Sequence, residues 1–316
     1  MIVAAELERV FKARHRMLWG LCYRMTGIAA DADELVQDTF VRALERAPDL
    51  DEHECHRWLL RVATHLSLDR LRARRRRRYV GPWLPGPIET PEIEVPSDEI
   101  ETTYERLESV SYAFLLALEA LQPTARAVVI LRDVFDYSAL EVAAVLETTE
   151  VNVRVVHHRA RRRLATVRRD APPLSELKGA TRAALEALLG CFLRQDATAM
   201  EALLAESVRT ITDGGGEYTA LSKPLIGRAA VIRFHLETAR RRAPVSRTEF
   251  CEVNGLPALV IETVPLRRQM APRIVLRCEV DRAGRIVELH SILAPRKLTA
   301  IRLSSAPDPA RQPAPS

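Results

Sequence analysis

The 316-residue sequence lacks the features that mark secreted, disulfide-bonded and membrane-spanning proteins. Its five cysteines are scattered and odd in number, and no two of them form a C-x-x-C pair, so a disulfide framework is not expected. The first residues show no basic segment followed by an apolar core, and no apolar run approaches the ~20 residues of a membrane span. We therefore expect a cytoplasmic protein in a reducing compartment.

Acidic residues are missing from residues 151–169, a segment that carries seven arginines. Residues 71–78 form a second arginine-dense segment, with six arginines. Like charges one helical turn apart repel each other by a few tenths of a kcal/mol per pair, and a bound polyanion would relieve that repulsion. Between the two segments, residues 89–108 contain eight acidic residues and one arginine. The charge pattern therefore predicts two DNA-contacting helices separated by an acidic stretch.

Apolar periodicity and prolines divide the chain into domains. Residues 4–78 show helical spacing almost throughout, whereas the prolines of residues 81–97 remove backbone donors and forbid a continuous helix. The predicted organisation is a helical domain at 1–80, an extended acidic linker at 81–105, a second helical domain at 106–171, an α+β domain at 174–300 and a disordered tail at 301–316.

The third domain combines helical and strand patterns. We expect helices at 175–195, 197–206 and 227–242, and strands at 207–212, 248–253, 256–263, 274–280 and 285–293. Asn254-Gly255, between two of these strands, is a strong signal for a type I′ hairpin, because both turn residues need positive φ. The alternation of elements indicates an α+β domain.

Residues 138–157 have the pattern of a helix-turn-helix. Leu140, Ala143 and Leu146 are expected to face inward on the first helix. Glu147 occupies the turn position where glycine is usual, at a cost on the order of 1 kcal/mol. The outward face of the second helix, which fits a DNA major groove, carries Asn152, Arg154, Val155, His158, Arg159 and Arg162. The alternative is an ordinary helical hairpin with a solvated basic face.

Short motifs in the first half of the chain resemble those of bacterial extracytoplasmic-function (ECF) sigma factors, in which a linker joins a sigma-2 domain to a sigma-4 domain. The motifs are YRMTG at 23–27, DADELVQDTF at 31–40, WL at 58–59, LDRLR at 68–72 and HRAR at 158–161. Two further motifs resemble those of the ECF group with a fused SnoaL-like domain: GPWLPGP at 81–87, similar to GPWLPEP, and DGGG at 213–216, similar to DGGGK.

This resemblance implies a multidomain fold of two all-α sigma domains, the second with a helix-turn-helix, followed by an α+β SnoaL-like (nuclear-transport-factor-2-like) cone-shaped domain. It implies an alternative-sigma transcription initiation factor that directs RNA polymerase to specific promoters and is modulated by its own C-terminal domain. The implied partners are promoter DNA and core RNA polymerase, through the β′ clamp helices and the β flap. Enzymatic activity, cofactors and metals are not implied, and we expect a monomer when the protein is free.

The resemblance also assigns roles to individual residues. An exposed acid and amide face with an aromatic anchor would bind the polymerase: Asp33, Glu34, Gln37, Asp38 and Phe40. The minus-ten promoter element would be held by Arg57, Arg61, Arg70, Arg72 and Arg74, with Trp58 mostly in the core. The outward face of the helix-turn-helix would read the minus-thirty-five element. For Phe40 the alternative is a place in the core.

An interdomain regulatory contact is implied for Trp83, Leu84, Pro85, Asp213, Gly214, Gly215, Gly216, Glu217 and Arg296. Three departures from the group's motifs stand out, since Gly86 replaces an acid, Glu217 a lysine and Arg296 an aspartate. We hypothesise that Glu217 and Arg296 approach each other as a pair of swapped polarity, with unrelated surface drift as the alternative. The acidic residues 92–101 could occupy an RNA channel of the polymerase, or form a solvated linker.

Two rival functions are weighed against this interpretation. A SnoaL-type enzyme with a nucleic-acid-binding extension would use Asp213, His235 or His290 as a base in its pocket. A polymerase-independent helix-turn-helix regulator would bind palindromic DNA as a dimer. A third feature, His53, Cys55 and His56 in the loop before Trp58, suggests a metal or redox site only weakly, because adjacent Cys and His side chains rarely reach one ion.

Overall fold

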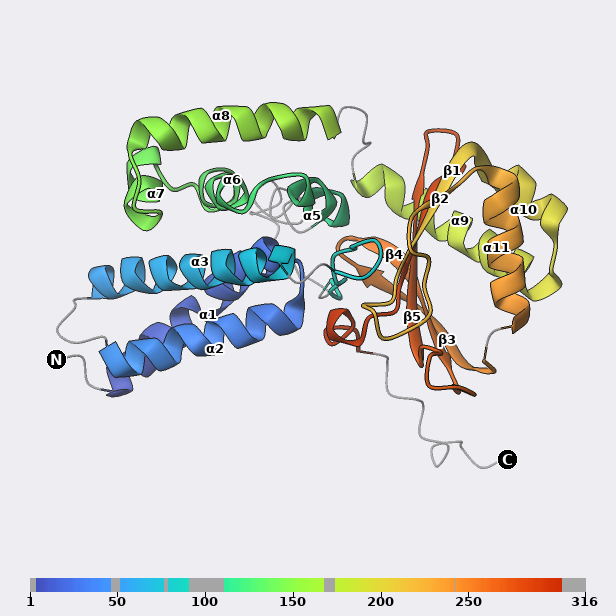
Figure 1. Ribbon diagram of the computed structural model, residues 1–316, viewed down its shortest axis with the longest axis horizontal. Helices are drawn as coiled ribbons and strands as arrows, with labels where there is room; N and C mark the ends of the chain where they lie inside the picture. The colour runs from blue at the N-terminus through green and yellow to red at the C-terminus, as the bar shows by residue number, and fades with distance from the viewer. Residues whose placement is uncertain are drawn as a thin grey trace, which may run out of the picture.

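The computed structural model describes residues 4–46, 52–76, 79–90, 111–167, 174–241 and 243–302. They form two helical domains and an α+β domain, with a short connecting segment, residues 79–90, between the helices and the sheet (Figure 1). The predictions for the acidic residues 92–101 and for the tail beyond residue 302 lie outside the described residues. Among the helices that are described, none is long and apolar enough to span a membrane.

The N-terminal domain is a three-helix unit. Its helices are α1 (Ala4–Thr26), α2 (Ala29–Arg46) and α3 (Glu52–Arg76). Apolar residues at helical spacing, such as Leu18, Leu21 and Leu59, are fully buried where the helices meet. Trp58 is partly buried against this core, as predicted. The predicted loop at His53–His56 is wrong, because these residues lie in the first turns of α3.

The helix-turn-helix domain lies above α3 in Figure 1. Its elements are α5 (Tyr112–Glu119), α6 (Pro123–Val129), the π-helix η2 (Ile130–Val134), α7 (Ala139–Val145) and α8 (Glu150–Val167). A capping box starts α7: Ser138 Oγ accepts the Glu141 N–H, and the Glu141 carboxylate accepts the Ser138 N–H at 2.7 Å. Glu147 has φ of 52°, so the predicted left-handed turn is confirmed.

One inward position of the helix-turn-helix was predicted wrongly. Leu140 is 66% exposed, whereas Val142 and Val145 are buried. Because α7 begins at Ala139, its inner face follows Ala139, Val142 and Ala143, and Leu140 lies off that face. The inner face of α8 agrees with the prediction, since Val153, Ala160 and Leu164 are buried.

The C-terminal domain is an α+β domain with a six-stranded sheet in the order β2-β1-β6-β5-β4-β3. Its elements are α9 (Leu174–Arg194), α10 (Ala197–Leu203), β1 (Leu204–Asp213), β2 (Leu225–Ile226), α11 (Arg228–Arg241), β3 (Val245–Val253), β4 (Leu256–Thr263), β5 (Arg273–Val280), β6 (Ile286–Ile292) and the 3₁₀-helix η3 (Pro295–Lys297). Strands β1 and β6 are parallel. Asn254 and Gly255 both have positive φ, as the hairpin prediction requires. The two-residue strand β2 was not predicted.

The sheet is apolar on both faces, and different parts of the chain cover each face. Alternate residues such as Leu259, Ile261 and Leu276 pack with α9 and α11 in one core. The residues between them, including Val260 and Val275, belong to a second core completed by parts of the chain outside the sheet: Leu84, Tyr112, Leu298 and Ile301. The second face therefore binds the connecting segment and α5, and this contact positions the candidate site.

Candidate interdomain site and DNA-binding face

The connecting segment is held by all three domains through its backbone. The Gly86 N–H donates to Gly27 O at 2.7 Å, and Tyr23 Oη donates to Gly86 O at 2.8 Å. From α5, Tyr112 Oη donates to Pro85 O at 2.9 Å. The buried residues 84–87 are therefore not a free linker, and they lie outside any helix, as predicted.

The hairpin turn between β3 and β4 holds the far end of the segment. Asn254 Oδ1 accepts the Ile88 N–H at 3.1 Å, and Ile88 O accepts the Asn254 N–H at 3.0 Å. Thr90 N–H donates to Glu252 O at 2.9 Å. Asn254 Nδ2 also donates to Tyr23 Oη at 3.0 Å, so one turn residue links the N-terminal domain, the connecting segment and the sheet.

Asp213 is the acidic centre of the interdomain site. Its side chain is completely buried and accepts hydrogen bonds from Leu84 N–H at 2.8 Å, Gly215 N–H at 3.1 Å, Tyr79 Oη and Lys297 Nζ. A buried carboxylate is stable only when it is paired and hydrogen-bonded, and these four donors meet that need. Asp213 therefore binds the connecting segment and does not act as a free base.

Lys297 is the cationic partner, and its side chain is 2% exposed. Its Nζ also donates to Leu84 O at 2.6 Å and lies 3.2 Å from the centroid of the Trp83 ring. Burial lowers the pKa of Lys297 to about 8, although Asp213 opposes that shift. The pair ties η3 to the connecting segment, and removing either partner would leave a buried charge uncompensated.

A second cluster of charges ties the N-terminal domain to the helix-turn-helix domain. Glu119 of α5 accepts from Arg74 at 2.6 Å and from Arg126 at 2.8 Å. The same two arginines donate to backbone carbonyls of α1, at Thr26 and Met25. Burial alone would raise the pKa of Glu119, but Arg126 and Arg74 lower it. The carboxylate therefore stays ionised between the two domains.

Arg296 links the C-terminal domain to α2. It donates to Asp31 and Glu34, at 2.8 Å each, and Arg70 of α3 donates to the same two carboxylates. The hydrogen bond from Arg296 is the main cause that lowers the pKa of Glu34. No ion pair of the described residues joins Arg296 to Glu217, which is exposed, so the approach of these two side chains stays a hypothesis.

Glycines allow the backbones at this site to approach closely. A Cβ on Gly86 would lie 2.7 Å from Lys297 O, so the residue that replaces the acid of the linker motif leaves no space for a side chain. Gly215 and Gly216 have φ of 66° and 79°, and Cβ atoms there would lie 2.9 Å from Ala294 and 3.3 Å from Val80. The two motifs meet directly at Leu84, whose N–H donates to Asp213 at 2.8 Å.

The segment predicted to bind the polymerase lies on α2. Gln37 and Asp38 are exposed, and Asp33 accepts from Trp19 Nε1 at 2.6 Å. Phe40 contradicts the prediction of an exposed aromatic anchor, because only 8% of it is exposed. It packs edge-on against Phe11, with 3.7 Å between the ring centroids. Its place in the apolar stripe of the helix accounts for this burial.

The arginines predicted to contact the minus-ten element are largely paired within the molecule. Arg61 lies 3.7 Å from Glu147 in the helix-turn-helix domain, and Arg72 pairs with Asp69. Arg70 is held by Asp31 and Glu34, as described above. Arg74 is bound to Glu119, and its guanidinium lies 3.8 Å from the centroid of the Trp83 ring, so its contact with DNA stays a prediction. Arg57 is exposed.

The residues predicted to read the minus-thirty-five element do share one exposed face of α8. They are Asn152, Arg154, Val155, His158, Arg159 and Arg162, and all six are exposed. Arg154 pairs with Glu150 one turn earlier on the same helix. This face satisfies the geometric requirement for a helix in a major groove.

The other candidate bases and the metal site do not converge. Thr210 and His235 are hydrogen-bonded at 2.9 Å beneath α11, whereas His290 pairs with Glu288 at 3.0 Å and lies near Tyr112. Within the described residues, no group of three or more His, Cys, Asp or Glu side chains could hold a metal ion. His56 instead meets the Tyr137 hydroxyl at 2.9 Å.

Acid should weaken the C-terminal domain through His235. Burial lowers the pKa of His235 to about 4, whereas an unfolded histidine titrates near 6.5. Between these values the unfolded chain binds the additional proton, so the free energy of unfolding should fall by about 3 kcal/mol as the pH drops from about 6.5 to 4. Urea unfolding of the full chain should show this loss, and His235→Gln should remove most of it. An equal acid dependence in both proteins would contradict the assignment.

Two helical domains lie beside an α+β domain, and α8 presents an exposed basic face. This arrangement is that of a DNA-binding transcription factor. Residues 10–77 match the Sigma-70 region 2 family, and residues 111–164 match the Sigma-70, region 4 family. The chain is 31% identical over 301 residues to the ECF RNA polymerase sigma factor SigJ of Mycobacterium tuberculosis (strain ATCC 25618 / H37Rv), covering 92% of each chain. The chain belongs to the ECF RNA polymerase sigma factors.

Members of this family are transcription initiation factors that bind core RNA polymerase and promoter DNA, and they are not enzymes. The crystal structure of M. tuberculosis SigJ superposes with a TM-score of 0.67 at 26% identity, covering 92% of this chain and 97% of that chain. SigG of M. tuberculosis (strain CDC 1551 / Oshkosh) is 37% identical over 177 residues, covering 49% of this chain and 47% of SigG. The match to SigJ thus includes the C-terminal α+β domain.

Several residues of the site were not predicted from the sequence. They are Tyr23, Tyr79, Tyr112, Arg126, Asn254 and Lys297. Lys297 directly follows Arg296, one of the departures from the group's motifs, so its position was the available signal. Tyr112 and Arg126 gave no comparable signal, because an aromatic residue or an arginine on an amphipathic helix is ordinary in sequence.

Proposed function

We propose that this sigma factor directs core RNA polymerase to specific promoters in the cytoplasm and that its C-terminal domain restrains it in a closed arrangement. In this arrangement the connecting segment is bound between the domains, and opening it frees the surfaces that polymerase and DNA need. In the closed arrangement, ionised side chains of the protein itself pair with the groups that polymerase and DNA would otherwise bind. The proposal explains why a promoter-binding factor carries a third domain with a buried interface to the other two.

The observation that carries the proposal is the pairing of predicted binding residues inside the molecule. Glu34, on the predicted polymerase face, is bound by Arg296 of the C-terminal domain. Arg74, predicted to bind DNA phosphates, is bound by Glu119 instead. A phosphate and a carboxylate compete for the same guanidinium geometry, so DNA can engage Arg74 only after the closed arrangement opens.

Charge reversal at Arg296 should strengthen polymerase binding. Each partly exposed pair contributes roughly 0.2–1 kcal/mol, and Arg296→Glu replaces two attractions with repulsion from Asp31 and Glu34. We expect core RNA polymerase to bind the variant about 2- to 10-fold more tightly, with more run-off transcript at limiting sigma factor.

Arg282→Glu is the matched control, because Arg282 is exposed in a hairpin of the same domain and the substitution makes the same charge change. It should leave the affinity for core polymerase unchanged. Equal affinities for the wild type and Arg296→Glu, or equal gains in both variants, would show that the contact with α2 does not restrain the protein.

A further inference from the structure

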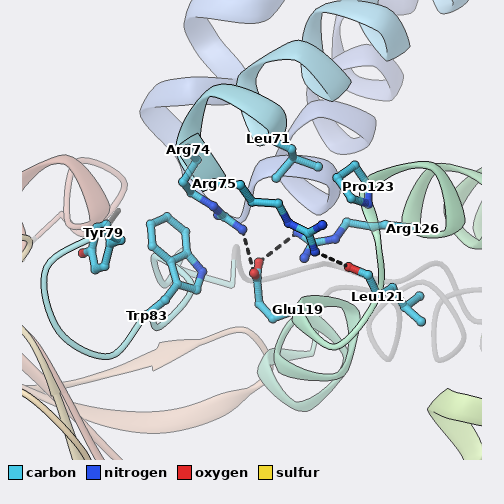
Figure 2. A pocket seen from close by; sticks show the side chains of 9 residues that line it. All are labelled: Leu71, Arg74, Arg75, Tyr79, Trp83, Glu119, Leu121, Pro123 and Arg126. Carbon is cyan, nitrogen blue, oxygen red and sulfur yellow. Dashed lines mark hydrogen bonds and ion pairs between the residues drawn. The ribbon is translucent and has the colours of Figure 1, made fainter. Parts of the chain in front are cut away.

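A cavity of about 210 Å³ lies where the N-terminal domain, the connecting segment and the helix-turn-helix domain meet (Figure 2). Its lining combines charged, aromatic and apolar side chains: Leu71, Arg74, Arg75, Tyr79, Trp83, Glu119, Leu121, Pro123 and Arg126. At roughly 30 Å³ for each water molecule of the liquid, the volume exceeds that of a few waters. The cavity is large enough for a small organic molecule.

The charges of the lining do not balance. Arg74, Arg75 and Arg126 contribute three positive charges and Glu119 one negative charge, which leaves two positive charges in excess. Figure 2 shows Arg74 and Arg126 directed at Glu119, whereas Arg75 is directed at the Leu121 carbonyl. Among the residues that the structure describes, Arg75 donates to the uncharged oxygens of Gln122 and Leu121 and pairs with no carboxylate. An anion in the cavity would relieve the repulsion among these cations.

Two buried donors of the lining have no acceptor among the residues that the structure describes. Arg126 is 3% exposed and its Nε is unpartnered, and the buried Trp83 Nε1 is unpartnered too. In Figure 2 the indole nitrogen lies on the side of the ring that faces the arginines. Leaving a buried donor unsatisfied costs about 1–3 kcal/mol, and a bound acceptor would remove that cost. An anion with hydrogen-bond acceptors would satisfy both the unpartnered donors and the charge excess.

We propose that this cavity binds a small phosphate monoester. A phosphate monoester carries a charge of about −1.5 to −2 at neutral pH, which matches the excess of two positive charges, and it offers three strong acceptor oxygens. Arginine forks bind phosphate oxygens in pairs. Leu71, Leu121 and Pro123 supply an apolar wall for the organic part of the ester.

The ligand would act on the closed arrangement, because its site is complete only there. The walls come from α3, the connecting segment and α5 to α6, and they separate when these parts move apart. A ligand that binds one arrangement stabilises it in proportion to its differential affinity. The binding site stands on the closed geometry alone, whereas an effect of the ligand on transcription rests also on the proposed function.

Isothermal titration calorimetry of the full chain with phenyl phosphate, and separately with inorganic phosphate, tests the proposal. We expect saturable binding of phenyl phosphate at one site per chain and weaker binding of inorganic phosphate. Arg75→Gln should weaken the binding of phenyl phosphate at least ~10-fold, since it removes a charge-assisted hydrogen bond. Trp83→Phe, which removes Nε1 and keeps an aromatic ring, should weaken it by a smaller factor.

Arg76→Gln is the matched control, because Arg76 is the exposed neighbour of Arg75 on α3 and does not line the cavity. Arg76→Gln should change the affinity for phenyl phosphate by no more than about twofold, which is less than the loss of one charge-assisted hydrogen bond would cause. No saturable binding to the wild type, or equal losses for Arg75→Gln and Arg76→Gln, would overturn the proposal. Neither result would affect the Arg296 experiment, so the two proposals fail separately.

Discussion

Replacing Lys297 with methionine should open the closed arrangement. Methionine keeps much of the volume of the side chain but leaves the buried carboxylate of Asp213 without its cation. Removing one partner of a buried ion pair is destabilising by about 3–5 kcal/mol, so the equilibrium between closed and open chains should shift by roughly two to four orders of magnitude. Small-angle X-ray scattering should then report a larger radius of gyration for Lys297→Met than for the wild type.

Lys223→Met is the matched control for this substitution. Lys223 is an exposed lysine of the same domain, and its replacement makes the same change of charge and side chain at the surface. It should leave the scattering curve unchanged. A wild-type radius of gyration for Lys297→Met would mean that the Asp213–Lys297 pair does not hold the domains together.

Truncating Tyr112 should uncouple the helix-turn-helix domain from the C-terminal domain. Tyr112 is 1% exposed, its ring lies 3.7 Å from the guanidinium of Arg277, and it fills the second face of the sheet. Removing a large buried aromatic side chain costs about 3–5 kcal/mol. The change also uncovers Arg277, whose buried Nε and Nη1 have no partner among the described residues. Calorimetry of Tyr112→Ala should show the two domains unfolding in separate transitions at lower temperature.

Tyr112→Phe separates the ring from the hydroxyl. It removes only the hydrogen bond to Pro85 O, which contributes about 1 kcal/mol, and it keeps the packing on Arg277. We expect this variant to unfold almost as the wild type does. If Tyr112→Ala also unfolds like the wild type, α5 is not a structural part of the interface.

Local features of the fold followed from the sequence. The helix-turn-helix was predicted down to the left-handed conformation of Glu147, and the Asn254-Gly255 turn was predicted with its positive φ values. Both depend on neighbouring residues alone, through capping, periodicity and turn chemistry. The prediction that Leu140 faces inward was wrong, because the residue at which α7 begins rotates its inner face by about one residue. Periodicity alone does not determine where a helix begins.

The interdomain site could be predicted only in part, because its energetics depend on contacts between residues far apart in the chain. The linker and glycine motifs pointed to Asp213, but its partner Lys297 lies 84 positions away. Arg74 was expected to meet DNA, and nothing near it in the sequence shows that Glu119 would bind it. The motif resemblance implied a contact at Trp83, Leu84 and Pro85, but the prolines alone describe only the conformation of the backbone, so the partners in the N-terminal domain and α5 were missed.

Run-off transcription with purified core RNA polymerase on genomic promoter fragments tests the restraint most directly, comparing the wild type, Lys297→Met and Lys223→Met at equal limiting concentrations. If the C-terminal domain restrains the sigma factor, Lys297→Met should yield more promoter-specific transcript than the wild type, and Lys223→Met should match the wild type. A yield from Lys297→Met equal to or below that of the wild type, from a chain that scattering shows to be open, would contradict the restraint.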